Sequence, residues 1–410
     1  MVEIHVVGPV GLQGRGVVGL AVLATIGSMI LTAWLWPRLA GRGWGRWAGR
    51  VGLLLVCQLM AVLMAGVALN DYFDFYNSWS DLVGSSAGTG PLPIQVAAFA
   101  PVGTSAGGTS AVGSATGARQ LTTVYVDRQF GTPQRRVGHT DQLIVSGPSS
   151  HISAQALVYL PPQYNDPAYA HVQFPVTLVI AGYPGHIGTL VRNLEVPRTM
   201  NDLLAAGRVR PMVVVMVSPT VAPPRDTECA DVPGGPQVET WLAQDVPQVV
   251  AARYRVLAPG AWGTLGVSTG GFCAVKLVMR HPDVFCCAVG MSGYLHAITD
   301  LTTGDLYLHD AALQHASDPL WRLTHLPPPR VRILLTASRA ESSLYQQAQA
   351  FVAADRAPLQ VATLMVPSGG HNFGVWVREL PTCLQWLSLS LPGAPDGGAP
   401  LPPLPPLPVG

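Results

Sequence analysis

Short apolar segments alternate with helical segments between residues 138 and 390, and this alternation restricts the fold more than any other feature of the chain. Runs such as VTLVIAG (176–182) and PMVVVMVS (211–218) are apolar throughout, as expected of strands that are buried on both faces. Strands are predicted at 154–161, 176–182, 211–218, 262–267, 286–293, 331–338 and 361–368, and helices at 238–254, 270–281, 342–355 and 377–391. This pattern indicates an α/β fold with a mainly parallel sheet and helices on both faces.

One junction between a predicted strand and a predicted helix carries the motif G-x-S-x-G. The segment GTLGVSTGGF covers residues 263–272, and its one serine is Ser268. The chain must turn sharply there, and the flanking glycines let the backbones pack closely. The turn directs the hydroxyl out at the top of the sheet, beside a helix N-terminus that favours negative charge. This context predicts a nucleophile at Ser268 rather than a serine with only a structural role in the turn.

A serine nucleophile needs a general base, and His371 is the predicted base. It lies in VPSGGHNFGVW, just after the last predicted strand, which suits the order Ser, Asp/Glu, His of the α/β-hydrolases. His281 comes before Pro282 at a helix end and suits a structural role, while His186 precedes the serine. The alternative for His371 is an ordinary histidine of a surface loop.

The acid of the triad is expected after the strand that lies between the serine and histidine segments. Glu341 follows that strand directly, in VRILLTASRAESSLY, and precedes the next helix. Asp355 lies at the far end of that helix, and Glu379 lies beyond the predicted base. Glu341 is therefore the predicted acid, although a glutamate at a helix N-terminus is also favoured by the helix dipole alone.

An acyl-transfer site also needs two backbone N–H donors for the oxyanion. Thr269, directly after the nucleophile, is the first predicted donor. Tyr183, in the loop after the strand at 176–182, is the second, with an ordinary strand-end turn as the alternative. Because the chemistry proceeds through an acyl-serine, no metal or organic cofactor is expected.

The order of these segments resembles an esterase family of α/β-hydrolases. GVSTGGFCAVKLVMRHPDVFCCAVGMSGY, ETWLAQDVPQVVAARY, LVYLPPQY and SGGHNFGVW carry the resemblance, over about residues 138–390. The family includes esterase D-like hydrolases, feruloyl esterases and secreted mycolyltransferases. The resemblance implies an α/β-hydrolase fold, and it carries the triad and oxyanion roles over to Ser268, Glu341, His371, Thr269 and Tyr183.

The chain also departs from the family pattern in two places. Thr269 stands where the family often has methionine after the nucleophile, and IAGY stands where many hydrolases have His-Gly before the oxyanion donor. Neither change removes a backbone donor, but both change the pocket. The segment NDYFDFYNSWSDLVG (70–84) resembles the membrane-anchored bacterial branch of the family.

Two apolar segments before this domain are long enough to cross a membrane as helices. Gly16–Trp36 contains no charged residue, and Val51–Leu69 contains Gln58 as its only long polar side chain. The whole chain has 11% charged and 49% hydrophobic residues, a bias typical of membrane association. We expect a transmembrane hairpin within residues 1–69, with helices at about 16–36 and 51–69. The alternatives are buried core helices or, for the first segment, a signal peptide.

The segment RLAGRGWGRWAGR joins the two predicted helices. Its arginines are Arg38, Arg42, Arg46 and Arg50, and a short arginine-rich loop favours the cytoplasmic side of a membrane. Both ends of the hairpin then lie outside, so the later domain is expected to be extracytoplasmic, at the cell membrane. The formal net charge of +1 gives no reason to expect a nucleic-acid partner.

Outside the cytoplasm a disulfide is permitted, and the chain has six cysteines. Cys229 and Cys273 are the candidate pair, because one precedes and one follows the GVSTG turn in segments that are expected to converge. Two separate buried thiols are the alternative. Cys286 and Cys287 are adjacent in an apolar run, which is typical of core residues.

Composition marks the remaining boundaries. Residues 70–137 are interpreted as a juxtamembrane segment followed by a mostly flexible linker rich in glycine, serine and alanine. Residues 138–390 form the expected catalytic domain. The proline-rich residues 391–410 are interpreted as a disordered tail, with a ligand for a proline-binding module as the alternative.

Together these features predict a membrane-anchored, extracytoplasmic serine esterase that acts on carboxylic esters through an acyl-serine intermediate. An acyltransferase that moves acyl groups onto envelope sugars or glycolipids is the alternative, because it would use the same acyl-enzyme. A non-catalytic, membrane-anchored binding protein on a hydrolase fold is the second alternative. The expected substrate is a small ester, a lipid or a glycolipid, and the sequence identifies no protein partner.

Overall fold

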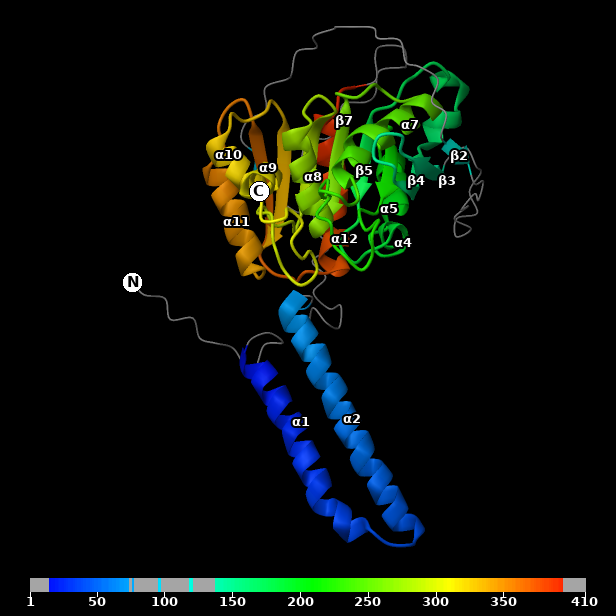
Figure 1. The fold of residues 1–410 in the computed structure, drawn as a ribbon. Helices are drawn as coiled ribbons and strands as arrows, with labels where there is room; N and C mark the ends of the chain where they lie inside the picture. The colour runs from blue at the N-terminus through cyan, green and yellow to red at the C-terminus, as the bar shows by residue number, and fades with distance from the viewer. Residues whose placement is uncertain (1–14, 74–75, 77–94, 97–117, 121–136, 394–410) are drawn as a thin grey trace. The chain divides into compact units, whose positions relative to one another are not determined.

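The computed structural model describes residues 15–73, 76, 95–96, 118–120 and 137–393 (Figure 1). The chain divides into two compact units. The first consists of Met1–Gly88 together with Pro367–Val375, and the second of Thr89–Val366 together with Trp376–Gly410. The expected boundaries of the linker at 70–137 and of the tail at 391–410 fall mostly outside the described residues.

Two long helices dominate the first unit. Helix α1 spans Arg15–Leu35 and helix α2 spans Trp44–Phe73, with a 3₁₀ turn at Trp36–Leu39 between them. Within Gly16–Leu39 and Trp44–Asn70, an 18-residue window reaches a mean hydropathy of 2.0 and 2.4, respectively, so both segments are long and apolar enough to cross a membrane. Helix α2 begins earlier than the sequence predicted and includes the last two arginines of the expected loop.

Hydroxyl and thiol groups join α1 to α2. The Thr25 hydroxyl donates to the Met60 carbonyl at 3.1 Å, and the Thr32 hydroxyl and the Cys57 thiol lie 3.0 Å apart. Such small polar groups satisfy one another between helices that are otherwise apolar. The two helices therefore form a packed pair.

A ten-stranded sheet is the centre of the second unit (Figure 1). In chain order its strands are β1 Gln95–Val96, β2 Ala118–Gln120, β3 His139–Ser146, β4 Ser153–Leu160, β5 Val176–Ile180, β6 Val213–Val217, β7 Trp262–Val267, β8 Phe285–Met291, β9 Arg332–Ser338 and β10 Gln360–Val366. Their spatial order is β1-β10-β9-β8-β7-β5-β6-β4-β3-β2. The six strands from β10 to β6 are parallel, while β1, β4, β3 and β2 pair antiparallel at the two edges.

Helices cover both faces of this sheet. They are α4 Ile187–Arg192, α5 Val196–Ala205, α6 Val238–Thr240, α7 Val246–Arg253, α8 Thr269–Arg280, α9 Ala311–Ser317, α10 Pro319–His325, α11 Ser342–Ala353 and α12 Phe373–Ser390. A π-helical turn, Trp241–Asp245, joins α6 to α7. Adjacent residues of β7 show the two faces. The Thr264 hydroxyl donates to the Ala274 carbonyl of α8, whereas a Cβ on Gly263 would lie 3.2 Å from Leu387 of α12. Helices α8 and α12 thus cover opposite faces of the sheet (Figure 1).

The predicted fold class is confirmed, and the strands with continuous apolar runs lie where the sequence placed them. The sequence did not predict β3, because its first residues are polar and its buried positions follow no regular alternation. Strands β1 and β2 lie within residues 70–137, which were interpreted as a mostly flexible linker. There they pair with β10 and β3, respectively.

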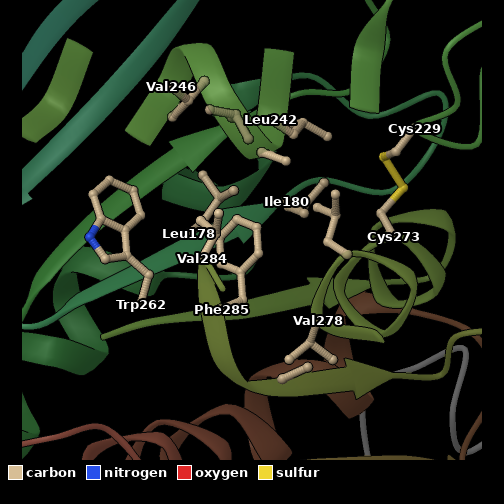
Figure 2. Close-up of a cluster of buried hydrophobic side chains, with 14 of the residues drawn as sticks. Leu178, Ile180, Cys229, Leu242, Val246, Trp262, Cys273, Val278, Val284 and Phe285 are labelled. Atoms are coloured by element: carbon tan, nitrogen blue, oxygen red, sulfur yellow. A yellow bond between two sulfur atoms is a disulfide. The ribbon is translucent and has the colours of Figure 1, made fainter. Parts of the chain in front are cut away.

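The core of the second unit is built from branched aliphatic side chains of the central strands and from aromatic residues. Figure 2 shows Leu178 and Ile180 of β5 beside Phe285 of β8, with Trp262 at the start of β7. At one side of this cluster, Cys229 and Cys273 form a disulfide with a Cα–Cα distance of 5.8 Å. The pair that the sequence singled out is thus joined, and it connects the loop before α6 to helix α8.

Candidate active site

Ser268 lies at the junction of β7 and α8, in a backbone conformation that non-glycine residues rarely adopt. Its φ is 57° and its ψ is −127°. The amide of Ser268 donates to the Met291 carbonyl at the end of β8, at 2.9 Å. Strained backbone of this kind persists only where the surroundings enforce it, and it is concentrated at functional sites. The structure therefore shows the sharp strand-to-helix turn that the G-x-S-x-G motif predicts.

The motif glycines are required because the backbones touch around this turn. A Cβ on Gly266 would lie 2.0 Å from the Gly270 carbonyl oxygen. A Cβ on Gly270 would lie 2.2 Å from the Ile180 carbonyl oxygen of β5. Both distances are shorter than any real contact of a Cβ, so only glycine lets β7, α8 and β5 approach this closely.

The two predicted oxyanion donors lie on either side of the serine. Thr269 is the first residue of α8, where backbone N–H groups have no partner within the helix. On the other side, a Cβ on Gly182 would lie 3.0 Å from the Cβ of Ser268, and Tyr183 is the next residue. The Tyr183 hydroxyl donates to the Pro224 carbonyl. Thr269 thus follows Ser268 directly, Tyr183 follows a glycine that lies close to that serine, and the oxyanion role of both amides is a proposal.

Glu341 follows β9 and is 1% exposed. Its Oε2 accepts hydrogen bonds from the Ser338 amide at 3.1 Å and from the Ser292 hydroxyl at 3.0 Å. The indole N–H of Trp376 donates to the same Ser292 oxygen at 3.1 Å, so the serine proton is directed at the carboxylate. Two donors and burial hold this carboxylate in one orientation, as a triad acid requires.

His371 lies in Pro367–Val375, the segment that belongs to the first unit. It follows β10, whose last residue, Val366, is paired with Ser338 of β9. Within the segment Gly369 has φ 119°, and the Asn372 side chain accepts from the Val375 amide at 3.2 Å. In the second unit, Ser268, Thr269 and Glu341 all lie at the edge of the sheet where the parallel strands have their carboxyl ends. The role of His371 in the site is a proposal.

The alternatives that the sequence raised for base and acid make other contacts. The His186 ring accepts from the Gly188 amide at 3.1 Å and caps α4. The His281 ring lies 2.8 Å from Glu239, as suits a structural role. The Asp355 carboxylate lies at the amino end of β10, 3.4 Å from the Val361 amide, which is the opposite edge of the sheet from Ser268.

Glu379, the remaining alternative acid, lies on α12 and is fully buried. The Thr336 hydroxyl of β9 donates to its Oε2 at 2.7 Å, while its Oε1 has no hydrogen-bond partner among the described residues. Burial raises the pKa of Glu379 to about 8; the Thr336 hydrogen bond opposes this shift and the charge of Glu341 adds to it. Glu379 is thus mainly a neutral carboxylic acid at pH 7, and its pKa responds to the charge of the predicted triad acid.

Replacing Glu379 with glutamine is expected to remove a pH dependence of stability. In the native chain the folded pKa of about 8 exceeds the ordinary value of 4.5, so the contribution of Glu379 to stability is complete below pH 4.5 and is lost as pH rises through 8. The full loss is on the order of 5 kcal/mol. Melting temperatures of the full-length protein in detergent, from pH 5 to 8.5, should fall less for E379Q than for wild type.

The partly exposed Glu195 offers a control, since E195Q leaves the buried acid in place. Glu228, whose pKa burial also raises to about 8, contributes equally to all three proteins. If the melting temperatures of wild type and E379Q fall in parallel as pH rises, the assignment of a buried proton to Glu379 is contradicted.

Sequence reasoning missed Ser292 and Asp226. Ser292 lies within the strand predicted at 286–293, directly after the observed end of β8, and has φ 45°, but a single serine in MSGY gives no signal of its role. Asp226 lies three residues before Cys229, and its Oδ2 accepts a hydrogen bond from the Thr269 hydroxyl at 2.9 Å. The predicted cysteine pair was the available signal, since it brings the segment before Cys229 to α8.

Comparisons with known proteins place the chain in a family. The family described as "Putative esterase" matches residues 151–387. An uncharacterised protein of Corynebacterium glutamicum is 23% identical over 270 residues, 62% of either chain. The MPT51/MPB51 antigen of Mycobacterium bovis is 39% identical over 71 residues, 17% of this chain and 23% of that one. The alignments thus span less than two thirds of the length of these curated relatives.

The second unit also has the fold of a solved enzyme. A ferulic acid esterase superposes with a TM-score of 0.52 at 17% identity, covering 63% of this chain and 100% of the other. At that identity the likeness shows the fold, which is that of the α/β-hydrolases.

Proposed function

This chain belongs to the esterase family of α/β-hydrolases, and on that premise we propose that it is a membrane-anchored, extracytoplasmic serine esterase. Its class is that of a serine ester hydrolase or acyltransferase. The observation that carries the proposal is the turn at Ser268, with φ 57° and with glycines at 266 and 270 that no other residue can replace. A structural serine would not require such a turn.

In the proposed reaction His371 removes the proton of the Ser268 hydroxyl, and the serine oxygen attacks the ester carbonyl. The oxyanion that forms is bound by the amides of Thr269 and Tyr183. The start of α8 adds the partial positive charge of a helix N-terminus. The carboxylate of Glu341, held by its two donors, orients the imidazole and stabilises its protonated form.

The intermediate then collapses, and His371 gives its proton to the leaving alcohol. The acyl group stays on Ser268 until water, activated by the same imidazole, attacks the acyl-enzyme and releases the acid. Each step moves one proton between oxygen and imidazole, so the site needs no further group to complete the cycle.

Anchoring and placement rest on the first unit and on the disulfide. Helices α1 and α2 each have the length and hydropathy of a membrane span. The arginines between Trp36 and Arg50 favour a cytoplasmic turn, which would leave the catalytic unit outside. The Cys229–Cys273 disulfide suits an oxidising compartment.

An acyltransferase is the second candidate, and the anchor is the observation that favours it. A site tethered to a membrane meets lipid and glycolipid alcohols at high local concentration, and such an alcohol can replace water at the acyl-enzyme. The acyl-serine is common to both reactions, so the residues of the site do not separate them.

Labelling with a fluorophosphonate, followed by product analysis, tests the proposal. The full-length protein in detergent is expected to react at Ser268, as peptide mass mapping would show, and to release acid from 4-nitrophenyl esters of graded chain length. Adding a sugar or glycolipid acceptor distinguishes the two candidates, because a transferase forms the acylated acceptor at the expense of free acid. A folded protein that neither labels nor turns over would instead favour a binding protein on a hydrolase fold.

A further inference from the structure

The residue after the proposed nucleophile has a buried side chain with a charged partner. Thr269 is 5% exposed, and its hydroxyl donates to Asp226 Oδ2 at 2.9 Å. The hydroxyl of Thr269 is therefore committed to holding its own residue in place. The bond between Thr269 and Asp226 is a charge-assisted hydrogen bond that is buried away from water, and such bonds are among the stronger hydrogen bonds in proteins.

Asp226 is itself held on several sides. It is 4% exposed, and its Oδ1 accepts from the Glu228 amide at 2.9 Å. Its own amide donates to the Thr302 carbonyl at 3.0 Å. The preceding Arg225 guanidinium donates to the carbonyls of Thr303 and Asp305, at 2.7 and 2.6 Å. The carboxylate that meets Thr269 therefore has a fixed position.

The disulfide ties the same segment to the same helix. Thr269 and Cys273 are four residues apart on α8, so they lie one above the other on one face. Asp226 contacts the first and Cys229 is bonded to the second. Further along α8, the Lys276 ammonium donates to the Glu228 carbonyl at 3.0 Å. Residues 226–229 thus clamp the first two turns of α8 at three points.

We propose that Asp226 is a positioning residue for the oxyanion site, which acts through the Thr269 hydroxyl to fix the direction of the Thr269 amide. An ionised carboxylate is only an acceptor and cannot itself stabilise an oxyanion, so its contribution passes through the hydroxyl it binds. The preorganisation of such amides supplies much of the rate enhancement of acyl transfer. The inference rests on the proposed function, because it assumes that the Thr269 amide binds an oxyanion.

A double-mutant cycle on ester hydrolysis by the full-length protein tests the inference. Thr269→Val removes the hydroxyl at constant shape, Asp226→Ala removes the acceptor, and Thr269→Ser restores the hydroxyl. Each of T269V and D226A is expected to lower kcat about 30-fold with KM within about 3-fold, since losing one oxyanion donor outright costs about 10²–10³-fold. The double variant should lose no more than either single one, and T269S should stay within about 3-fold of wild type.

Thr264→Val is the matched control. It deletes another buried threonine hydroxyl that donates to α8, at the Ala274 carbonyl, away from Ser268. A melting temperature for each variant shows the loss of stability, which T264V should share with T269V while keeping the wild-type kcat. If a general loss of packing around α8 is the cause, kcat should fall in both T264V and T269V. If the hydroxyl positions the Thr269 amide, kcat should fall only in T269V.

The outcomes separate this inference from the function beneath it. If wild type hydrolyses esters while T269V and D226A match it, the positioning role is overturned and the esterase stands. Additive losses, or losses confined to KM, would likewise overturn it. If wild type neither labels nor hydrolyses, the proposed function fails and the inference with it.

Discussion

Replacing Ser268 with alanine is expected to lower kcat for ester hydrolysis by about 10⁶-fold and to abolish fluorophosphonate labelling. The hydroxyl is the bond-forming atom, so its removal leaves only the binding site and the oxyanion donors. His371→Ala is expected to cost nearly as much, because an unactivated serine hydroxyl is a weak nucleophile at neutral pH. The double variant should lose little more than either single variant, since the two residues act as a unit.

His281→Ala is the control for the histidine variant. His281 pairs with Glu239 and lies at the C-terminal end of α8, the opposite end from Ser268. It should cost some stability and leave kcat near that of wild type. Retained labelling in H371A, or equal losses in H371A and H281A, would remove His371 from the role of base.

The second large effect is expected on folding. Gly270→Ala places a methyl group 2.2 Å from the Ile180 carbonyl oxygen and 2.7 Å from that of Ala181. Backbone cannot move aside as a flexible side chain can, so the substitution should destabilise the second unit by about 4 kcal/mol or more. In a unit of this size that is a fall in Tm of roughly 10 °C, measurable by thermal denaturation in detergent.

Gly266→Ala should behave in the same way, because its methyl group would lie 2.0 Å from the Gly270 carbonyl oxygen. Gly52→Ala on α2 is the matched control, since nothing lies within 4 Å of the added carbon and alanine is the better helix former. A G270A protein with the Tm and activity of wild type would show that the backbones around Ser268 are not packed as described.

Much of the second unit follows from local sequence. The predicted strand at 262–267 is β7, Trp262–Val267, and the helix predicted at 270–281 is α8, Thr269–Arg280. Continuous apolar runs identify strands buried on both faces, and the glycines at 266 and 270 identify the turn. Each signal lies within a few residues of the feature that it predicts, so no knowledge of distant contacts is needed.

The position of the acid was predictable only in part. The sequence placed three carboxylates after or near the strand β9, and topology distinguishes them. Asp355 lies at the wrong edge of the sheet, and Glu379 lies on α12, where burial keeps it protonated. Only Glu341 lies at the carboxyl edge with two donors on its carboxylate. The edge of the sheet at which each carboxylate lies, its burial and its hydrogen bonds all depend on how the strands assemble.

By itself, the sequence determined the α/β class, the strained turn at Ser268 and the presence of two span-length apolar helices, because each is set by the spacing of neighbouring residues. The tertiary structure alone decided that Ser292 holds Glu341 and that Asp226 holds Thr269. Those partners are separated by more than forty positions in the chain. They meet because strand order and the Cys229–Cys273 bond bring distant loops to one edge, and side-chain hydrogen bonds act only over about 3 Å.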